Sequence, residues 1–573
     1  MVELKIGSLL GHGKDAVVTN IHKKNGDKVA AGELVLEVEG SKGNMAVKSQ
    51  VSGSIDEIKV AVGDKVDSQT LLAVINAEQF KGSTTTISKD NKPNSFNYFQ
   101  NMIKPIKQKI ETDILIIGGG PGGYVAAIKA AQMGAKVVLA EKEALGGTCL
   151  NLGCIPTKAL VRSAEVYREL REAEKYGCYA ENISYDLKKV MDRKDSVIKE
   201  LVSGIQYLMD KNKITIVKGM AEFIDKESVL VKSSTSETTI MAKNIIVATG
   251  SKSVNPPIKG IELSEVINSS EALNLKELPK KLVIIGGGVI GMEFAFIFSS
   301  FGSQVTVIEY VDDCLMNCDS DICNELYRSA KDCGIKIYTK AKVEAIIRAE
   351  DGSSIVEFKT ENETKYVTAD KILSAAGRAP YYEGLNIENA GIELGEKRGI
   401  KVNSHMETNV EGIYAIGDVT NIVQLAHVAS HQGIVAVESI MGTSVDMDYS
   451  TVPSVIFTYP EIAMVGITEK QAEIMGIDIK VGKFPIAANG KALTYGESQG
   501  FIKLIEDKST GRLIGGAVVG LHASDLIGEI TLAVKNNLTA KHIEETIHAH
   551  PTTTEIIHEA ALELRGGSIH FVK

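Results

Sequence analysis

The sequence predicts a multi-domain protein that contains an N-terminal all-β sandwich and two α/β dinucleotide-binding domains. Three observations lead to this fold class. The chain has 573 residues, whereas a single hydrophobic core seldom serves more than about 250–300 residues. A β-type segment is repeated within residues 1–79, and a strand–glycine loop–helix pattern occurs twice further along the chain. Together these features divide the chain into at least three structured parts.

The composition is that of a globular protein, with 44% hydrophobic and 24% charged residues. The 63 basic and 73 acidic residues give a net charge of −10, so we expect no nucleic-acid partner and no anionic membrane partner. No stretch reaches about 18 uninterrupted apolar residues, and the N-terminal segment MVELKIGSLLGHG lacks the features of a targeting signal. Seven cysteines are too few for a secreted disulfide scaffold. We therefore expect a cytoplasmic protein without a membrane span.

The first 79 residues contain an internal repeat. NGDKVAAGELVLEVE at residues 25–39 is echoed by VGDKVDSQTLLAVIN at residues 62–76. A small β-sandwich built from two similar halves would produce this pattern. Between the halves, Lys42 is flanked by serine on one side and Gly-Asn on the other, which favours a tight hairpin with Lys42 at its exposed tip. By itself an exposed lysine is usually only a solvating charge.

Residues 80–110 lose the alternating pattern and are rich in Ser, Thr, Asn and Lys, with two prolines. Such a segment buries little apolar surface and is predicted to be a flexible linker. Chain statistics of about 5–6 Å × √n would let the first domain move over tens of ångströms. A swinging carrier needs that kind of mobility.

Residues 112–117, TDILII, form an apolar run typical of a strand in a buried parallel sheet. The run leads into GGGPGG, where Gly118, Gly120 and Gly123 match G-x-G-x-x-G, and then into a helical pattern and a second strand that ends at Glu141. The glycines permit a tight turn and close approach of a pyrophosphate, and the carboxylate binds ribose hydroxyls. A glycine triad alone is weak evidence, but the complete order predicts a dinucleotide site.

The same pattern returns at residues 281–285, where KLVII is followed by Gly286, Gly288 and Gly291, a helix, and a strand that leads to Glu309. Two dinucleotide sites in one chain suggest FAD and NAD, because hydride can pass between a flavin and a nicotinamide. No arginine cluster follows Glu309, which favours NAD over NADP. The first site, next to a pair of cysteines, is assigned to FAD, and the second to NAD.

Cys149 and Cys154 lie in GGTCLNLGCIPTK, residues 146–158, directly after the first glycine pattern. A C-x4-C pair can close a disulfide ring if the local turn brings the Cα atoms close enough. Most cysteine pairs in intracellular proteins are inert core residues. Here the neighbours are small, polar and proline residues typical of turns and helix starts, and a nearby lysine would stabilise a thiolate. The pair is therefore predicted to be a dithiol held against the first dinucleotide.

The segment GGTCLNLGCIPTK resembles the active-site signature of the flavoprotein disulfide reductases, and within them that of the dihydrolipoamide dehydrogenase family. Residues 1–79 resemble a lipoyl domain, so the resemblance covers nearly the whole chain outside the linker. It implies two Rossmann-like α/β domains followed by a C-terminal α+β dimerisation domain. The implied ranges are 1–79 for the lipoyl domain, 80–110 for the linker, 111–258 and 385–450 for the FAD-binding domain, 259–384 for the NAD-binding domain and 451–573 for the dimer-interface domain.

The resemblance also implies roles for residues around the flavin. Lys158 and Glu293 would form an ion pair beside flavin N5. Gly250, in NIIVATGS, would stand at the exit from the first dinucleotide domain, and Asp418, in GIYAIGDV, would contact the ribityl chain. The segment LAHVASHQG, which contains Ala426, resembles the flavin-side helix LAHxAxxEG of the family.

A dithiol that exchanges with a substrate disulfide needs a proton acceptor near pH 7, for which histidine has a suitable pKa. The segment HAHPTTTE resembles the HAHPTxSE motif of the family, which implies that His550 is the general base and Glu555 its partner. In the family this histidine comes from the other subunit, so the resemblance implies a homodimer. Dihydrolipoyl thiolate would attack the disulfide at Cys149, and Cys154 would face the flavin.

The lipoyl-domain resemblance implies that Lys42 carries covalent lipoate, added by a lipoate-attaching enzyme. The aspartate common before this lysine is replaced by Ser41. The expected partner is a lipoylated acyltransferase (E2) or a related carrier of a multienzyme complex, whether for pyruvate, 2-oxoglutarate, acetoin or glycine cleavage.

Three alternatives compete with this interpretation. A glutathione-type reductase should show arginines after the second dinucleotide strand, and a mercuric reductase should show a C-terminal cysteine pair, but residues 540–573 contain no cysteine. A protein that acts mainly as a lipoyl carrier or scaffold is the alternative from another class.

The remaining cysteines lack metal-ligand spacing, so we predict structural thiols and no metal site at Cys178, Cys314, Cys318, Cys323 and Cys333.

Overall fold

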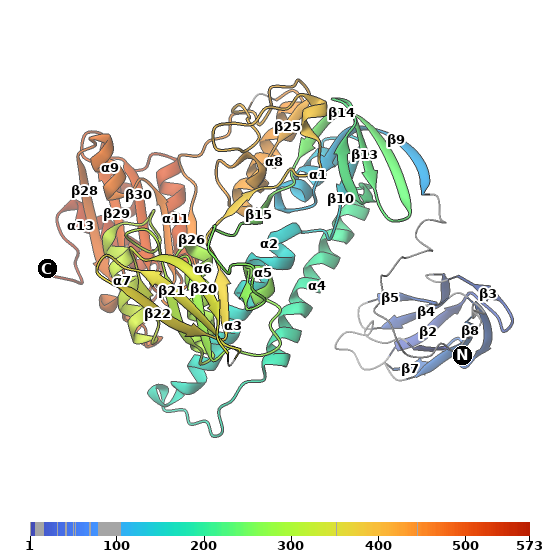
Figure 1. The fold of residues 1–573 in the computed structure, drawn as a ribbon, viewed down its shortest axis with the longest axis horizontal. Coiled ribbons are helices and arrows are strands. Elements are labelled where there is room, and N and C mark those ends of the chain that lie inside the picture. Colours follow the sequence, from blue (N-terminus) through green and yellow to red (C-terminus); the bar gives the residue numbers. More distant parts are fainter. Residues whose placement is uncertain are drawn as a thin grey trace. The chain divides into compact units, whose positions relative to one another are not determined.

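The computed structural model describes residues 2–5, 16–30, 33–40, 43–49, 51, 53–67, 70–77, 105–350, 352–443 and 445–572. The chain forms two compact units, Met1–Tyr98 and Phe99–Lys573 (Figure 1). The fold class predicted from the sequence is confirmed: an all-β sandwich, two α/β dinucleotide-binding domains and a C-terminal α+β domain.

The first unit is a sandwich of two four-stranded antiparallel sheets, ordered β1-β8-β6-β3 and β5-β4-β2-β7. Alternate apolar side chains of both sheets, such as Val18, Val38 and Ile75, fill the space between them. The strands are β1 (Val2–Lys5), β2 (Ala16–Ile21), β3 (Lys28–Val29), β4 (Leu34–Gly40), β5 (Gly43–Lys48), β6 (Gly53–Ile58), β7 (Lys65–Val66) and β8 (Leu71–Ala77).

The internal repeat of the sequence is visible in the hydrogen bonds of the two halves. The carboxylate of Asp27 accepts from the backbone N of Lys24 at 2.8 Å, and that of Asp64 accepts from the backbone N of Ala61 at 2.8 Å. Strands β3 and β7, which follow these turns, occupy equivalent edge positions in the two sheets. Strands β4 and β5 pair in antiparallel fashion. Lys42 lies between them in sequence and is outside the described residues.

The first α/β domain has a seven-stranded sheet in the order β11-β10-β9-β14-β13-β12, with β25 paired to β14. Strands β9, β10, β11, β14 and β25 run parallel, and β25 arrives from much later in the chain. The strands are β9 (Ile106–Ile117), β10 (Val137–Glu141), β11 (Thr215–Lys218), β12 (Met220–Phe223), β13 (Ser228–Lys232), β14 (Ser236–Val247) and β25 (Ile413–Ala415). The helices are α1 (Pro121–Gln132), α2 (Gly147–Leu152), α3 (Cys154–Arg171), α4 (Leu187–Lys211) and α8 (Ala426–Ile440).

Strand β9 begins at Ile106, inside the range that the sequence assigned to the linker. Residues 106–110 pair in parallel with residues 236–240 of β14, a strand that also pairs with β13. Strand β10 pairs only with residues 114–117, so residues 106–110 form an edge of the sheet. Their side chains are mostly exposed, whereas Thr238 and Ile240 of β14 are buried. Residues 106–110 are polar because they face water at this edge, and polarity alone made them resemble a linker.

The second α/β domain has a parallel five-stranded sheet in the order β16-β23-β17-β18-β19, with an antiparallel three-stranded sheet β20-β21-β22 beside it. Helix α6 carries buried residues on all sides, which fits its apolar sequence. The strands are β16 (Val266–Ile267), β17 (Lys281–Ile285), β18 (Gln304–Ile308), β19 (Lys336–Tyr338), β20 (Lys342–Arg348), β21 (Ser354–Lys359), β22 (Thr364–Ala369) and β23 (Lys371–Ser374). The helices are α5 (Ser269–Ala272), α6 (Val289–Ser300) and α7 (Ser320–Asp332). A short pair, β15 (Ser251–Ser253) with β24 (Arg378–Pro380), joins the two α/β domains.

The C-terminal domain has an antiparallel five-stranded sheet in the order β26-β27-β30-β29-β28. Helices α11 and α13 lie beside this sheet (Figure 1). Their apolar residues share a core with it. The strands are β26 (Ser454–Ile456), β27 (Ile462–Gly466), β28 (Ile479–Pro485), β29 (Phe501–Asp507) and β30 (Leu513–Val519). The helices are α9 (Glu469–Met475), α10 (Gly490–Thr494), α11 (Ala523–Lys535), α12 (Ala540–Glu544) and α13 (Glu555–Arg565). None of the helices in the described parts of the chain is long and apolar enough to span a bilayer.

Candidate active site

The two glycine loops have the same hydrogen-bond pattern. In the first, the carboxylate of Glu141 accepts from the backbone N of Gly119 at 2.6 Å and of Glu143 at 2.7 Å. In the second, the carboxylate of Glu309 accepts from Gly287 N at 2.5 Å and Val311 N at 2.9 Å. Each acid therefore stands at the end of the second strand, tied to the glycine loop of the first. This is where the ribose of a bound dinucleotide is expected.

The third glycine of each loop is required by packing. A Cβ atom on Gly123 would lie 1.8 Å from the carbonyl oxygen of Gly118, and a Cβ atom on Gly291 would lie 2.0 Å from that of Gly286. Only glycine allows each helix to approach its strand so closely. Gly120 and Gly288 precede α1 and α6 in extended conformations, and no side chain caps either helix. Helix α1 begins with Pro121, which has no N–H, so the backbone N–H groups of Gly122 and Gly123 are the ones available to a phosphate there. In α6 the first N–H is that of Val289. The residues present therefore fit FAD and NAD.

The dithiol is held directly against the first glycine loop. Cys149 lies in α2, and Cys154 is the first residue of α3, with Gly153 between the two helices. The backbone N of Gly146 donates to the carbonyl oxygen of Gly119 at 2.8 Å. Gly147 has a left-handed backbone conformation, and a Cβ atom added to it would lie 2.7 Å from the Cα atom of Gly120. The segment with both cysteines is therefore fixed beside the site assigned to the flavin.

The two sulfur atoms are inequivalent. Both are thiol groups in this structure. A hydrogen bond from Cys149 lowers the pKa of Cys154 to about 7; burial opposes this shift, and the charge of Lys158 favours it. The same hydrogen bond, together with burial, raises the pKa of Cys149. In the reduced pair Cys154 is therefore the cysteine that ionises, as pH rises through about 7, while Cys149 keeps its proton.

Lys158 and Glu293, which are 135 residues apart, form the ion pair that the resemblance implied. The Nζ atom of Lys158 lies 2.8 Å and 2.9 Å from the two carboxylate oxygens of Glu293. Glu293 is 4% exposed and also accepts from the backbone N of Phe457 at 3.0 Å. Lys158 lies 4.3 Å from the centre of the Phe457 ring. This contact joins α3, α6 and the C-terminal domain one helical turn after Cys154.

Asp418 and Gly250 lie close together through Ser251. The hydroxyl of Ser251 donates to the Asp418 carboxylate at 2.5 Å and accepts from Nε of Arg378 at 2.8 Å. The charge of Arg378 faces both Asp418 and Cys154. Sequence analysis missed Arg378 and Ser251. Neither carries a motif signal of its own; the one available cue was that Ser251 directly follows Gly250.

Helix α8, which begins at Ala426, packs against the first glycine loop. The fully buried Gln432 accepts from the backbone N of Gly417 at 2.6 Å and donates to the hydroxyl of Tyr449 at 2.7 Å. The amide thereby fixes the turn that carries Asp418. This position, where the family motif has glutamate, is filled here by a side chain whose donor and acceptor are both satisfied.

His550 and Glu555 form a hydrogen-bonded pair at the start of α13. Nδ1 of His550 lies 2.8 Å from Glu555, which also accepts from the backbone N of Thr552 at 2.9 Å. Burial opposes ionisation of Glu555, but the hydrogen bonds from His550 and Thr552 hold its pKa below the ordinary value. The His550 side chain is 79% exposed in the single chain. Its free Nε2 edge is therefore accessible to another molecule.

The remaining cysteines have no environment that would activate them. Burial raises the pKa of Cys314 and Cys318 to about 12 and that of Cys323 to about 11. Burial also raises the pKa of Cys333, and Cys178 is exposed. Thiols with raised pKa values are poor nucleophiles.

Comparison with known proteins identifies the class that this fold and site define. Residues 112–433 match the family model "Pyridine nucleotide-disulphide oxidoreductase", residues 452–561 match its dimerisation domain, and residues 5–75 match the model "Biotin-requiring enzyme". The chain belongs to the pyridine nucleotide-disulphide oxidoreductase family. Its dimerisation domain supports a homodimer.

Within this family the curated relatives are dihydrolipoyl dehydrogenases. The chain is 44% identical over 466 residues to dihydrolipoyl dehydrogenase of Bacillus subtilis (strain 168), covering 81% of this chain and 98% of the relative. It is 40% identical to the mitochondrial dihydrolipoyl dehydrogenase of Pisum sativum, and the match covers 80% of this chain and 93% of the relative. Solved structures include LpdA from Mycobacterium tuberculosis, with a TM-score of 0.74 and 28% identity over 79% of this chain and 99% of that one. Another is the HOCl-induced flavoprotein disulfide reductase RclA of Escherichia coli, with a TM-score of 0.71 and 31% identity. The match covers 78% of this chain and 99% of that chain.

Proposed function

We propose that this chain oxidises protein-bound dihydrolipoamide to lipoamide and reduces NAD to NADH, as the dehydrogenase component of a 2-oxo acid, acetoin or glycine cleavage complex. The similarity to dihydrolipoyl dehydrogenases supports the reaction. The observation that carries the assignment is the dithiol, in which a Cys154 thiolate accepts a hydrogen bond from Cys149 beside the first glycine loop.

The chemistry at the two sulfurs follows from their difference in pKa. A dihydrolipoyl thiolate attacks Sγ of Cys149 in the oxidised pair, a mixed disulfide forms, and the electron pair of the broken bond leaves on Cys154. Cys154 is the better leaving group because the charge of Lys158 stabilises its thiolate. Cys149 can add its hydrogen bond only after it has been released as a thiol. The second lipoyl thiol loses its proton and attacks the lipoyl sulfur of the mixed disulfide, which closes the ring of lipoamide and releases Cys149 as a thiolate; Cys149 then takes up a proton and becomes the thiol of the reduced pair. FAD, when bound, supplies the two-electron relay from the reduced pair to NAD.

The proton of the second lipoyl thiol is assigned to His550. Glu555 binds Nδ1 of the imidazole and leaves Nε2 free to accept the proton. Because His550 is exposed in the single chain, we assign it to the active site of the partner subunit in the homodimer. Lys158, Glu293 and Phe457 would hold the flavin side of the site without exchanging protons with the substrate.

The first unit is proposed to be a lipoyl carrier. Its match to a biotin/lipoyl model supports covalent lipoate, which we assign to Lys42. A carrier tethered to its own dehydrogenase favours a second role, in which the unit passes reducing equivalents between a lipoylated acyltransferase and the dithiol. The lipoate-attaching enzyme would be a transient partner.

The reaction is tested with the purified full chain, free dihydrolipoamide and NAD. We expect NADH formation that is lost in Cys154→Ser and slower with NADP in place of NAD. Absence of NADH formation by the FAD-containing protein would contradict the enzyme assignment. Intact-mass analysis tests the carrier role: an unmodified Lys42 after expression in a lipoate-replete host would exclude it.

A further inference from the structure

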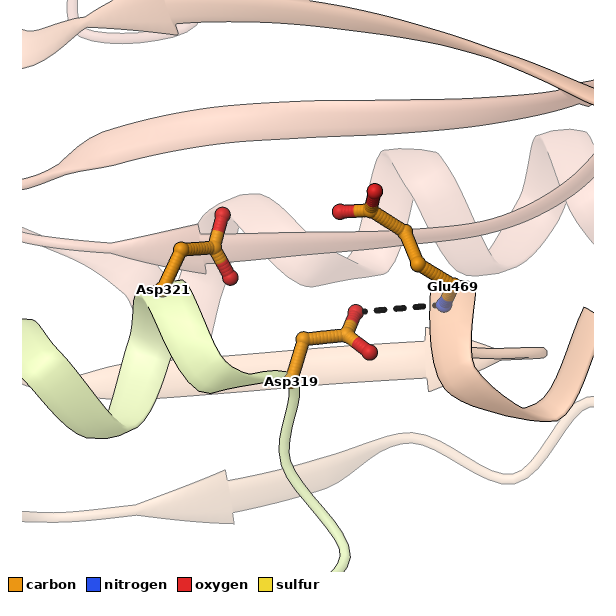
Figure 2. A group of neighbouring side chains, drawn as sticks. All are labelled: Asp319, Asp321 and Glu469. Carbon is orange, nitrogen blue, oxygen red and sulfur yellow. Dashed lines mark hydrogen bonds between the residues drawn. The ribbon is translucent and has the colours of Figure 1, made fainter. Parts of the chain in front are cut away.

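Three carboxylates converge at the boundary between the second α/β domain and the C-terminal domain. Asp319 and Asp321 lie at the start of α7, and Glu469 lies at the start of α9 (Figure 2). Their oxygens come within 4.8 Å of one another, a spacing that could hold a metal ion. An acidic cluster of this kind needs a positive charge at its centre.

A lysine supplies that charge. The Nζ atom of Lys503 lies 2.7 Å from Asp319, 2.9 Å from Asp321 and 2.8 Å from Glu469. Its side chain is only 1% exposed. Lys483 adds a second contact to Asp321 at 2.8 Å. The three hydrogen bonds use all the donors of the Lys503 ammonium group, so it replaces a metal ion.

The Lys503 contact crosses a domain boundary. Lys503 lies in β29 of the C-terminal sheet, whereas Asp319 belongs to the second α/β domain. Asp319 also accepts from the backbone N of Glu469 at 3.2 Å and of Lys470 at 3.3 Å. The same carboxylate thus takes the ammonium of one strand and the first N–H groups of α9. Residue 319 is fixed by the C-terminal domain from two directions.

Residues 310–318 connect this anchor to the second glycine loop. They follow Glu309 directly and end immediately before Asp319. In their middle, the backbone N of Leu315 donates to the carbonyl oxygen of Gly287 at 3.1 Å. A Cβ atom on Gly287 would lie 2.4 Å from Sγ of Cys314, so the segment packs directly on the glycine loop. A shift of Asp319 would therefore be transmitted to both Gly287 and Glu309.

Two further contacts hold the segment: the backbone N of Lys340 donates to the carbonyl oxygen of Val311 at 2.9 Å, and the backbone N of Cys314 donates to the Tyr327 hydroxyl at 2.8 Å. Its outer side is open. It borders an open groove of about 1250 Å³, lined among others by Tyr310, Met316, Lys340 and Ile479. Tyr310 is 70% exposed and Met316 is 61% exposed. The inner contacts and the anchor at Asp319 must hold it in place.

We propose that Lys503 is a positioning residue for NAD: by fixing Asp319 from the C-terminal domain, it holds residues 310–318, and through them Glu309 and Gly287, in the geometry that binds the dinucleotide. The inference rests on the proposed assignment of the second glycine loop to NAD. Lys503 touches no reacting atom, so its effect should appear in NAD binding and leave the dithiol chemistry unchanged.

The test compares full-length, FAD-containing protein with the variants Lys503→Met and Glu469→Gln. The control is Lys508→Met, which removes the same charge from an exposed pair with Asp478 in the same domain. NAD is titrated calorimetrically, and KM values for NAD and dihydrolipoamide are measured separately. We expect Lys503→Met to bind NAD about tenfold more weakly and Glu469→Gln about threefold, as direct neighbours in one network usually couple. The KM for dihydrolipoamide and the properties of Lys508→Met should stay at wild-type values.

Several outcomes would overturn the proposal. Lys503→Met with full FAD content and an unchanged Kd for NAD would do so, even if its melting temperature fell, because the residue would then be structural only. If Lys503→Met does not fold, an unchanged Kd for NAD in Glu469→Gln with full FAD content would overturn the proposal instead. A stoichiometric metal ion in the purified wild-type protein would also contradict it. Wild-type protein that binds no NAD would overturn the proposed function as well, whereas normal wild-type binding with unaffected variants overturns only the role of Lys503.

Discussion

At the scale of single residues, the charge of the dithiol is decided by what surrounds each sulfur. Cys154 begins a helix, accepts a hydrogen bond from Cys149 and lies near the Lys158 ammonium, and these influences together outweigh its partial desolvation. Cys149 is partly buried and donates that hydrogen bond, which keeps its proton in place. Above a pH of about 7 the reduced pair therefore carries one proton and one negative charge.

This difference predicts a pH dependence. In the reduced protein, Cys154 is ionised above its pKa of about 7 and protonated below it, so alkylation of Cys154 by iodoacetamide should accelerate as pH rises through 7. In Cys149→Ala the hydrogen-bond donor is removed, and the midpoint should move up toward the ordinary value of 9.0. The measurement is the rate of alkylation of the Cys154 peptide against pH, read by mass spectrometry. An unchanged midpoint in Cys149→Ala would refute the hydrogen bond as the cause.

At the scale of elements, the two α/β domains repeat one design with different neighbours. Both glycine loops have the same close contact between third and first glycine and the same acid tied to the loop. The first loop packs against the cysteine segment through Gly146 and Gly147, and the second packs against Cys314. The neighbours, more than the loops, distinguish the flavin site from the NAD site.

A pair of glycine substitutions should separate the two sites. Gly123→Ala would place a Cβ atom 1.8 Å from Gly118 O and Gly291→Ala one 2.0 Å from Gly286 O, so each must push its helix off its strand. We expect Gly123→Ala to lose FAD absorbance, and Gly291→Ala to retain FAD but bind NAD at least about tenfold more weakly.

The control is Gly204→Ala in the middle of α4, where a Cβ atom meets nothing within 4 Å. Because alanine favours helix over glycine by about 1 kcal/mol, this variant should be as stable as wild type or more so. Loss of FAD in Gly291→Ala, or normal FAD in Gly123→Ala, would show that the two sites have been assigned in the wrong order.

The sequence predicted those elements whose signal is local. Residues 281–285 are a strand as expected, and the run at 112–117 is the inner half of β9. The outer half of β9 was missed because exposed strands resemble polar linkers. Lys158 and Glu293 could be paired only through the family resemblance, since nothing local joins residues 135 positions apart. Arg378 and Lys503 escaped notice because an isolated cation in a sequence is usually solvated, and their partners are brought by the tertiary fold.

At the scale of the whole molecule, the C-terminal domain reaches into both dinucleotide regions. The backbone of Phe457 binds Glu293 on the flavin side, and Lys503 binds Asp319 on the NAD side. The domain also contains His550 and its partner Glu555, the first residue of α13. We therefore propose that this dimerisation domain couples assembly to the active site. The first unit, Met1–Tyr98, is a separate compact body.

Removal of the first unit should therefore spare the core reaction. A chain that begins at residue 99 is expected to form a dimer with FAD and to oxidise free dihydrolipoamide at close to the wild-type kcat, because the second unit is compact by itself. It should lose the ability to pass reducing equivalents through its own carrier. Lys42→Arg in the full chain, which cannot take lipoate, is the matched control and should behave like the truncated chain. A large loss of activity with free dihydrolipoamide would show that the first unit is part of the active site.

The assignment of His550 to the partner subunit is tested by complementation. Two chains, one with Cys149→Ser and one with His550→Ala, are co-expressed with different tags, and the heterodimer is isolated. If the base crosses the interface, the intact dithiol of one chain meets the intact imidazole of the other, and one of the two sites works. The heterodimer should then show about half the wild-type kcat, although each parental homodimer is nearly inactive. If dithiol and base belong to the same chain, every site in the heterodimer lacks one of them, and its activity will be no higher than that of the homodimers.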